Sequence, residues 1–307
     1  RRVLFRSLDE DGIPDWDDSN IGVEVGQSIQ DAIDIIPDGG TIELAAGTFP
    51  VFATLDTAGK AVTIRGAVDE EGGGPATHLD GGWLTRVLQC ESGEGVDTVF
   101  ENLVIQNGKR FEGGGGMSIV GSSPTLRNCW FRFNTGFVGG GMSITGGSPS
   151  LSVCAFTQNT GGSGAAMHNT DSSPTLSDCT FTGNSSGFSG GAMYNTNSSP
   201  TLSDCTFTGN MAGESGYGGA MYNEEDSRPI LTDCTFTGQS AASGAAIYND
   251  ASSPSLTRCD FEGNEAAFSG GGMFSTNESS PDLTDCTFTD NSASLGGGMH
   301  NDGCSPT

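Results

Sequence analysis

The sequence predicts an all-β fold in which the chain winds into a parallel β-solenoid of about 25 residues per coil. Between residues 126 and 291 the pattern Leu-x-x-Cys-x-Phe-x-x-Asn occurs seven times, with Gln239 in place of one Asn. Each copy is followed by glycine-rich residues that end in Gly-x-Met or a close variant. The cysteines of successive copies are separated by 25, 25, 26, 29, 25 and 27 residues, at Cys129, Cys154, Cys179, Cys205, Cys234, Cys259 and Cys286.

The spacing within one repeat predicts short strands. Apolar and polar residues alternate at 179–182 and 192–195, which is the period of a strand and not of a helix. The phrase Ser-Ser-Pro-Thr-Leu at 172–176 and 198–202 predicts a third strand, because its proline fixes the backbone at a corner. Three strands and three corners therefore fill each coil.

Energetics favour stacking of the coils. One coil buries roughly four large side chains, each worth about 1.5–3 kcal/mol, whereas ordering its backbone costs about 1–2 kcal/mol per residue. An isolated coil should not fold. Stacking at about 4.8 Å adds ladder hydrogen bonds on both sides of each strand and aligns like residues into internal rows of Leu, Cys, Phe and Met.

Residues 21–110 predict the beginning of the same solenoid. Ser28 precedes apolar positions 29, 32, 33 and 36, which predicts a short amphipathic helix with an N-cap. Alternating strands are predicted at 41–44, 61–64 and 99–105, so the solenoid is expected from about residue 41 onward. We expect the helix to cap the first coil. This order is similar to the start of right-handed β-helices of the pectin-lyase-like type, and the resemblance implies a right-handed parallel β-helix.

The regular repeats of residues 111–307 resemble a known family. Phe-x-x-Asn, as at 181–184, and Gly-Gly-Ala-Met, as at 190–193, are similar to the repeats of the chlamydial polymorphic outer-membrane proteins. Members of that family are secreted surface adhesins, so the resemblance implies an extracellular or cell-surface protein. The last residues, Ser305, Pro306 and Thr307, open another corner, and we expect the natural chain to continue beyond them.

Composition restricts the partners. The chain has 38 acidic and 12 basic residues, a formal charge of −26, and such a surface repels the phosphates of nucleic acid. No apolar run has the length of a transmembrane helix. Glycans and proteins of host or other cell surfaces are the expected partners.

The nine cysteines are predicted to be thiols rather than disulfides. Equivalent positions in neighbouring coils lie about 4.8 Å apart, beyond the Cβ separation of about 3.5–4.5 Å that a disulfide prefers. The row of cysteines is therefore expected to be buried as small apolar side chains. Cys90 and Cys304 lie outside the register of the repeats.

Residues 1–20 form an acidic segment with a candidate metal site. Carboxylates crowd around a glycine, as a Ca²⁺ loop requires, and the phrase resembles the end of a thrombospondin type-3-like calcium repeat. The segment also fits a plain acidic linker, and both interpretations stay open. The candidate ligands are Asp9, Asp11, Asp15, Asp17 and Asp18.

No catalytic residues are assigned. Polysaccharide-cleaving relatives of the pectin-lyase-like type use Gly-His-Gly and Arg-Ile-Lys motifs or a base near calcium, and the sequence contains neither motif. The arginines of the repeats, such as Arg132 and Arg258, have no evident carboxylate cluster in register. His168 and His300 replace aromatic residues of other coils, and His78 is expected in a surface loop.

Two rows of outward residues carry the remaining information. The residue after each repeat Met is predicted to point outward and to stack on its equivalents, offering a platform for sugars or a protein. A Thr-x-Thr row, as at Thr180 and Thr182, resembles ice-binding solenoids, but Asp260 and Glu262 interrupt it and β-propensity explains it. The candidate ligand-binding residues are His168, Tyr194, Tyr222, Tyr248, Phe274 and His300.

These observations predict a non-catalytic extracellular or cell-surface protein that acts as an adhesin or a structural stalk. A polysaccharide-active lyase or hydrolase is the alternative. An ice-binding solenoid is a weaker one.

Overall fold

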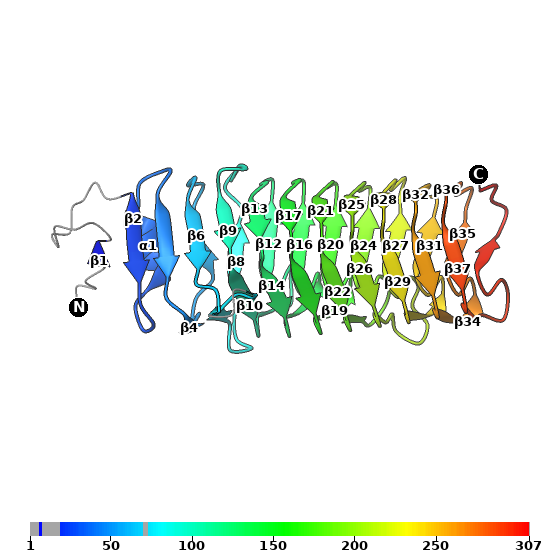
Figure 1. Ribbon diagram of the computed structural model, residues 1–307, viewed down its shortest axis with the longest axis horizontal. Helices are drawn as coiled ribbons and strands as arrows, with labels where there is room; N and C mark the ends of the chain where they lie inside the picture. The colour runs from blue at the N-terminus through cyan, green and yellow to red at the C-terminus, as the bar shows by residue number, and fades with distance from the viewer. Residues whose placement is uncertain (1–5, 8–18, 70–72, 307) are drawn as a thin grey trace.

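The computed structural model describes residues 6–7, 19–69 and 73–306, and these form one elongated stack of β-coils. In Figure 1 the colour passes from blue at one end to red at the other, so position along the axis follows the order of the sequence. Within the described residues the strands pair in parallel between successive coils, apart from the antiparallel pair that opens the stack. The predicted parallel β-solenoid is confirmed.

Each coil crosses three long sheets, which we name after their inward residue in the regular repeats. The Leu sheet contains β1 (Arg6–Ser7), β2 (Asn20–Val23), β3 (Thr41–Leu44), β6 (Thr63–Gly66), β9 (Val99–Glu101), β13 (Thr125–Arg127), β17 (Ser150–Ser152), β21 (Thr175–Ser177), β25 (Thr201–Ser203), β28 (Ile230–Thr232), β32 (Ser255–Thr257) and β36 (Asp282–Thr284). The Phe sheet contains β4 (Gly47–Pro50), β7 (Thr77–Asp80), β10 (Leu103–Gln106), β14 (Trp130–Arg132), β18 (Ala155–Thr157), β22 (Thr180–Thr182), β26 (Thr206–Thr208), β29 (Thr235–Thr237), β33 (Asp260–Glu262) and β37 (Thr287–Thr289). The Met sheet contains β5 (Leu55–Asp56), β8 (Leu88–Cys90), β12 (Met117–Val120), β16 (Met142–Thr145), β20 (Met167–Thr170), β24 (Met193–Thr196), β27 (Met221–Glu224), β31 (Ile247–Asp250), β35 (Met273–Thr276) and β38 (Met299–Asn301).

A fourth face, which the sequence pattern did not predict, lies between the Phe and Met sheets in chain order. Its short strands pair in two groups, so the glycine-rich residues are partly extended rather than only turns. The fourth face contains β11 (Lys109–Arg110), β15 (Thr135–Val138), β19 (Thr160–Ser163), β23 (Ser185–Ser186), β30 (Ser240–Ser243) and β34 (Glu265–Ser269).

The core consists of rows of identical side chains, as predicted. Phenylalanines of the Phe sheet stack nearly parallel along the axis, with ring centroids 4.6 Å apart between Phe181 and Phe207 and 4.8 Å apart between Phe207 and Phe236. Leucines, cysteines and methionines of the same coils are fully buried beside them. Burial of apolar surface therefore repeats in every coil, and each ring contacts its equivalents above and below.

All nine cysteines lie among the described residues and are free thiols. The row from Cys129 to Cys259 is buried, as predicted, and Cys179 Sγ lies 3.8 Å from the Leu151 carbonyl oxygen of the preceding coil. Cys90, which the sequence left unassigned, ends β8 in register with Ile119 and is also buried.

Corners of the coil rely on residues that tolerate a left-handed backbone. The residue before each repeat cysteine has positive φ, for example 53° at Asp178 and 54° at Asp204. Asp or Asn, which adopt this conformation at low cost, fills these positions except at Val153 and Arg258. The same corner occurs at Asn102, where φ is 57°. The single strand predicted at 99–105 is therefore wrong, because β9 and β10 meet there and belong to different sheets.

A buried row of amides follows the corner after the Phe sheet. Asn184 Nδ2 donates to the Phe156 carbonyl at 2.9 Å and to Asn210 Oδ1 at 2.9 Å. Its own Oδ1 accepts from the backbone N–H and the Nδ2 of Asn159, both at 3.0 Å. Each amide thus satisfies polar groups of both neighbouring coils, which explains Asn at the end of the repeat motif.

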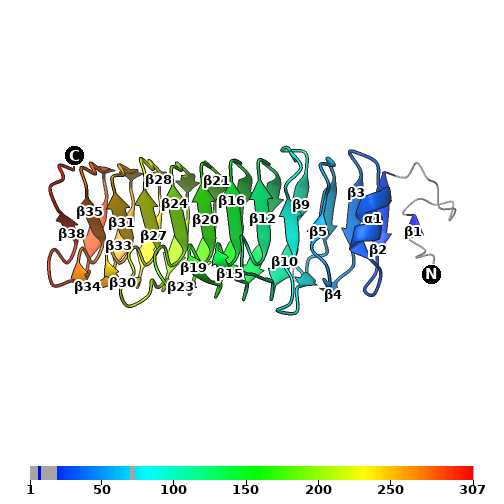
Figure 2. The same cartoon turned by 180° about the vertical axis from the view of Figure 1, so that it is seen from behind.

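The N-terminal end is closed by α1 (Ile29–Ile35), the only helix within the described residues. As predicted, Ser28 is the N-cap, and its side chain accepts from the Asp31 N–H at 3.1 Å. Lys60 Nζ donates to the carbonyl oxygens of Ile33, Asp34 and Ile36 at 2.7, 2.8 and 3.0 Å, where a cation stabilises the end of a helix. Figure 2 shows α1 packed across the first coil beside β5.

The parallel stack begins before residue 41, contrary to the expectation. β2 already pairs in parallel with β3, with Ile21 opposite Ile42. The first coil thus uses α1 where later coils place a strand of the Met sheet. Its apolar positions Ile29, Ala32 and Ile33 are buried against the core.

Glu94 is a buried carboxylate near the first coils. Its oxygens accept from Thr57 Oγ1, the Gly59 N–H, the Ser92 N–H and Ser122 Oγ at 2.8–2.9 Å. Burial alone would raise the pKa of this carboxyl, but the hydrogen bonds outweigh it and hold the pKa below its usual value. The ionised carboxylate therefore connects three successive coils through its hydrogen bonds.

Asn184→Leu should destabilise the stack by about 2–4 kcal/mol, because it leaves the buried Phe156 carbonyl and the Asn159 N–H without partners. Asn184→Gln is the matched control. Gln239 occupies the same row and donates from Nε2 to the Phe207 carbonyl at 2.7 Å, so the glutamine variant should lose much less. Chemical denaturation measures the free energy of unfolding of both variants. Equal losses of stability in the two would contradict the role of the amide row.

Glu94→Gln should remove part of the acid sensitivity of the protein. Because the folded pKa of Glu94 is depressed, its stabilising contribution is present above the unfolded pKa of about 4.3 and is lost as the pH falls through the folded pKa. At pH 7 the variant should be less stable by about 2–3 kcal/mol, and the difference should shrink toward pH 3. Denaturation between pH 3 and 7 measures it, with the exposed Glu214→Gln as control. A difference that is constant with pH would rule this out.

Candidate functional site

The predicted aromatic row lies in register on the outer side of the Met sheet. Ring centroids are 4.8 Å apart for His168 and Tyr194, 4.9 Å for Tyr194 and Tyr222, and 5.2 Å for Tyr222 and Tyr248. The row continues through Phe274 at 5.0 Å and ends at His300, whose ring meets it edge-on at 5.3 Å. The predicted stacking is confirmed from His168 to Tyr248, whereas the ring of Phe274 is tilted by 40° from Tyr248 and that of His300 is edge-on. Ser118 and Ser143 precede these rings in the same row.

The row is less exposed than strand alternation suggests. Tyr222 and Tyr248 expose only 8% and 9% of their surface, whereas His168, Tyr194, Phe274 and His300 are half-buried. Two features cover the rings. The ring of Tyr217 packs on that of Tyr248, with the centroids 4.7 Å apart. The glycine turns contact the aromatic row.

Those turns require glycine. At Gly190 the backbone has φ 65°, and an added Cβ would lie 3.0 Å from the Tyr194 Cβ and 2.5 Å from the Met193 carbonyl oxygen. The glycine-rich phrase of the repeat thus brings the turn against the aromatic row. The half-buried rings His168 and Tyr194 lie at the N-terminal part of the row, next to the serines.

Carboxylates lie beside the tyrosine hydroxyls. Tyr194 Oη donates to Glu224 Oε1 at 2.7 Å, and Tyr222 Oη lies 3.5 Å from Asp250 Oδ2. Burial first, and then the Asp250 charge, raises the pKa of Tyr248 to about 12, and burial together with Glu224 raises the pKa of Tyr194. The phenols therefore stay neutral donors at physiological pH.

The histidine at the start of the rings is neutral as well. Burial lowers the pKa of His168 to about 4, so its ring is an uncharged aromatic surface at pH 7. The row combines flat rings, phenol donors and carboxylate acceptors. Such a set can stack on sugar faces and bind hydroxyl or ammonium groups of a ligand.

The other predicted positions lie elsewhere. The candidate calcium ligands Asp9, Asp11, Asp15, Asp17 and Asp18 fall outside the described residues, and the described part contains no cluster of three metal-binding side chains. His78 lies in β7 of the Phe sheet, opposite Val104, and not in a loop as expected. The threonine row is in register on the Phe sheet, where Asp260 interrupts it and accepts from Thr287 Oγ1 at 2.6 Å.

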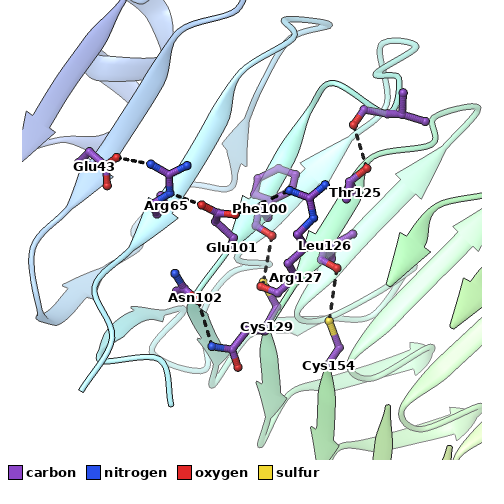
Figure 3. Close-up of polar contacts among 12 residues, drawn as sticks. Glu43, Arg65, Phe100, Glu101, Asn102, Thr125, Leu126, Arg127, Cys129 and Cys154 are labelled. Carbon is purple, nitrogen blue, oxygen red and sulfur yellow. Dashed lines mark hydrogen bonds and ion pairs between the residues drawn. The ribbon is translucent and has the colours of Figure 1, made fainter. Parts of the chain in front are cut away.

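Arg65 and Arg258 have carboxylate partners in neighbouring coils. Arg258 occupies the corner position of Asp233 in the next coil and binds both of its carboxylate oxygens, at 2.7 and 2.6 Å. On the Leu sheet Arg65 lies between Glu43, at 2.6 Å, and Glu101, as Figure 3 shows. These pairs link neighbouring coils, a use that the sequence pattern did not reveal.

The sequence reading also missed exposed phenylalanines on the fourth face. Phe111, Phe137, Phe188 and Phe268 expose 77%, 46%, 58% and 62% of their surface. Three of them follow the buried Asn of the repeat by three or four residues, at Asn134, Asn184 and Asn264, and this spacing could have identified them. Within the described residues no helix is long and apolar enough to span a bilayer.

Known structures share this architecture. ORF18 of Geobacillus virus E2 aligns over 92% of this chain and 61% of its own, with TM-score 0.56 and 15% identity. Pectin methylesterase from carrot aligns over 90% of this chain and 84% of its own, with TM-score 0.50 and 10% identity. PfbA, a surface adhesin of Streptococcus pneumoniae, covers 90% and 87% at 10% identity, but its TM-score of 0.36 is too low to support an argument. At these identities the likeness shows the fold alone.

A search of the curated proteins gives no significant match. The family model described as "Right handed beta helix region" matches residues 89–226 and 164–306, which together cover more than half of the chain. With the stacked parallel coils described above, this match shows that the chain belongs to the right-handed parallel β-helix family.

Proposed function

We propose that this chain is a non-catalytic extracellular or cell-surface protein that acts as an adhesin or a structural stalk. The aromatic row of the Met sheet is the observation that carries the proposal. His168 and Tyr194 present half-buried neutral rings, and Glu224 lies at hydrogen-bonding distance from the phenol. The ligands that fit are glycans, through stacking on sugar faces, and amphipathic segments of cell-surface proteins.

The form of the molecule supports the same function. Each coil advances the stack by about 4.8 Å, so the chain projects a surface away from the point where it is attached. Repeated side chains present the same chemistry at regular intervals. This arrangement favours multivalent contact with a polymer or a crowded surface.

The alternative is a polysaccharide-active enzyme. It is favoured by the fold that the chain shares with the carrot pectin methylesterase, although fold alone does not specify an activity. Incubation with pectins and alginates distinguishes the two functions. Release of methanol, reducing ends or unsaturated ends that is lost on mutation of a single side chain would establish the enzyme.

Replacing His168 and Tyr194 together by Ser should weaken binding to glycan arrays or cultured cells about tenfold, or roughly 1.4 kcal/mol. The change extends the serines already present at Ser118 and Ser143 by two coils, so the fold should be kept. Thr182→Ser, on the exposed Phe sheet, is the control. Unchanged binding with an intact fold would place the ligand elsewhere.

Tyr194→Phe separates the ring from its hydroxyl. It keeps the stack on His168 and removes only the donor to Glu224. If sugar stacking dominates, this variant should bind almost as well as the unmodified chain. Substitution of Tyr222 or Tyr248 is less informative, because those buried rings support the sheet.

A further inference from the structure

Carboxylates follow the aromatic row along the C-terminal ends of the Met-sheet strands. Glu224 ends β27 and Asp250 ends β31, two residues after Tyr222 and Tyr248, so ring and carboxylate lie on the same outer side of the sheet. Glu225 lies in the adjoining corner and is exposed. We call these three carboxylates the acidic edge of the row.

No basic side chain of the described residues forms a salt bridge with the acidic edge. Residues 133–307 contain no lysine and only two arginines. Arg228 lies 3.8 Å from Asp226, and Arg258 is held by Asp233. The hydroxyl and amide groups that donate to the acidic edge are neutral, and they fill only part of the roughly four lone-pair sites of each carboxylate.

The first coils show what a carboxylate at this position binds when an arginine is available. Glu91 directly follows β8 and, by the strand register, occupies the position that Glu224 holds in β27. Its Oε1 accepts from Ser118 Oγ at 2.8 Å and from Arg86 Nη1 at 3.2 Å. The guanidinium also donates to two backbone carbonyls, and the Arg86 side chain is only 11% exposed. This edge of the Met sheet therefore accommodates a guanidinium beside a carboxylate.

We propose that the aromatic row and its acidic edge bind a basic segment of a partner protein, whose arginines pair with Glu224 and Asp250. The inference rests on the proposed role of the row as the ligand-binding face, and it names the chemistry of the partner. A guanidinium is planar and weakly hydrated, and its apolar stem can cover the edges of the rings. Arginines at alternate positions of an extended segment lie about 6.6–6.8 Å apart, and their flexible stems span the difference from the coil spacing of about 4.8 Å.

An arginine fits the acidic edge better than a sugar does. The rings beside this edge, Tyr222 and Tyr248, expose only 8% and 9% of their surface, because each is packed between the rings of neighbouring coils. A sugar ring therefore finds no open aromatic face there, whereas an arginine needs only the carboxylate and an apolar border. Glycans that carry uronate or sulfate groups are repelled by the same charges.

Isothermal titration calorimetry with the peptide Thr-Arg-Thr-Arg-Thr-Arg tests the partner. It is best done at about 0.15 M salt, where the Debye length is about 8 Å and distant charges contribute little. The unmodified chain should bind the peptide, and Glu224→Gln combined with Asp250→Asn should weaken binding about tenfold. Both changes keep a side-chain oxygen as acceptor for Tyr194 and Asn277, so the fold should be kept.

The control variant removes the same charge elsewhere. Asp178→Asn combined with Asp204→Asn changes two exposed carboxylates at the corner between the Leu and Phe sheets, where Asn128 shows that asparagine is accommodated. This variant should bind the peptide almost as well as the unmodified chain. A peptide with citrulline in place of each arginine keeps the shape and loses the charge, and it should not bind. Circular dichroism and thermal unfolding confirm that each variant is folded.

Equal weakening in the two double variants would overturn the proposal, because it would show unspecific attraction to an acidic chain. Equal binding of the citrulline peptide, or no binding at roughly 1 mM arginine peptide, would overturn it as well. Glycan binding that depends on His168 and Tyr194, without binding of the peptide, would reject the basic partner and keep the proposed function. Glucosamine oligomers that bind through the acidic edge when the peptide does not would assign the edge to an amino sugar instead.

Discussion

The stack depends on one constraint, which is that every coil must meet its neighbours in the same register. Backbone ladders and buried amides enforce it together. Asn184 illustrates the point, because its amide pairs with the Phe156 carbonyl and the Asn159 N–H of the preceding coil and also donates to Asn210 of the next coil. A coil shifted by one residue would bury unpaired polar groups and expose its apolar row. Stability is therefore shared between neighbours and belongs to no coil alone.

The same constraint shapes the surface. A residue type that repeats at one outward position becomes a line along the axis, whether it stabilises the fold or binds a ligand. Such a row stabilises the fold where other side chains cover it, and it is accessible to a ligand where they do not. Tyr248 lies beneath Tyr217 and contributes to the sheet, whereas Phe188 on the fourth face has no such cover and exposes its ring.

Sequence patterns identified what is local and repeated: the three strands of each coil, the internal rows and the N-cap at Ser28. They failed where the residues of one coil differ from the repeat motif. At residues 100–105 Phe, Leu and Ile replace the Leu, Cys and Phe of the motif, so the corner at Asn102 resembled the middle of a strand. The burial of Tyr222 could not be predicted, because it depends on how the irregular residues before β27, Tyr217 among them, fold back on the row of rings.

Hydrogen bonds between coils run along the long axis of the molecule, and this direction has a mechanical consequence. Coil boundaries carry tension along the axis in series and by hydrogen bonds pulled lengthwise, so the weakest boundary opens before the others. Coils should then detach singly, in small force steps, and refold on the remaining stack. Force across the axis meets the covalent chain of each coil instead. The stack thus resists force across its axis better than force along it.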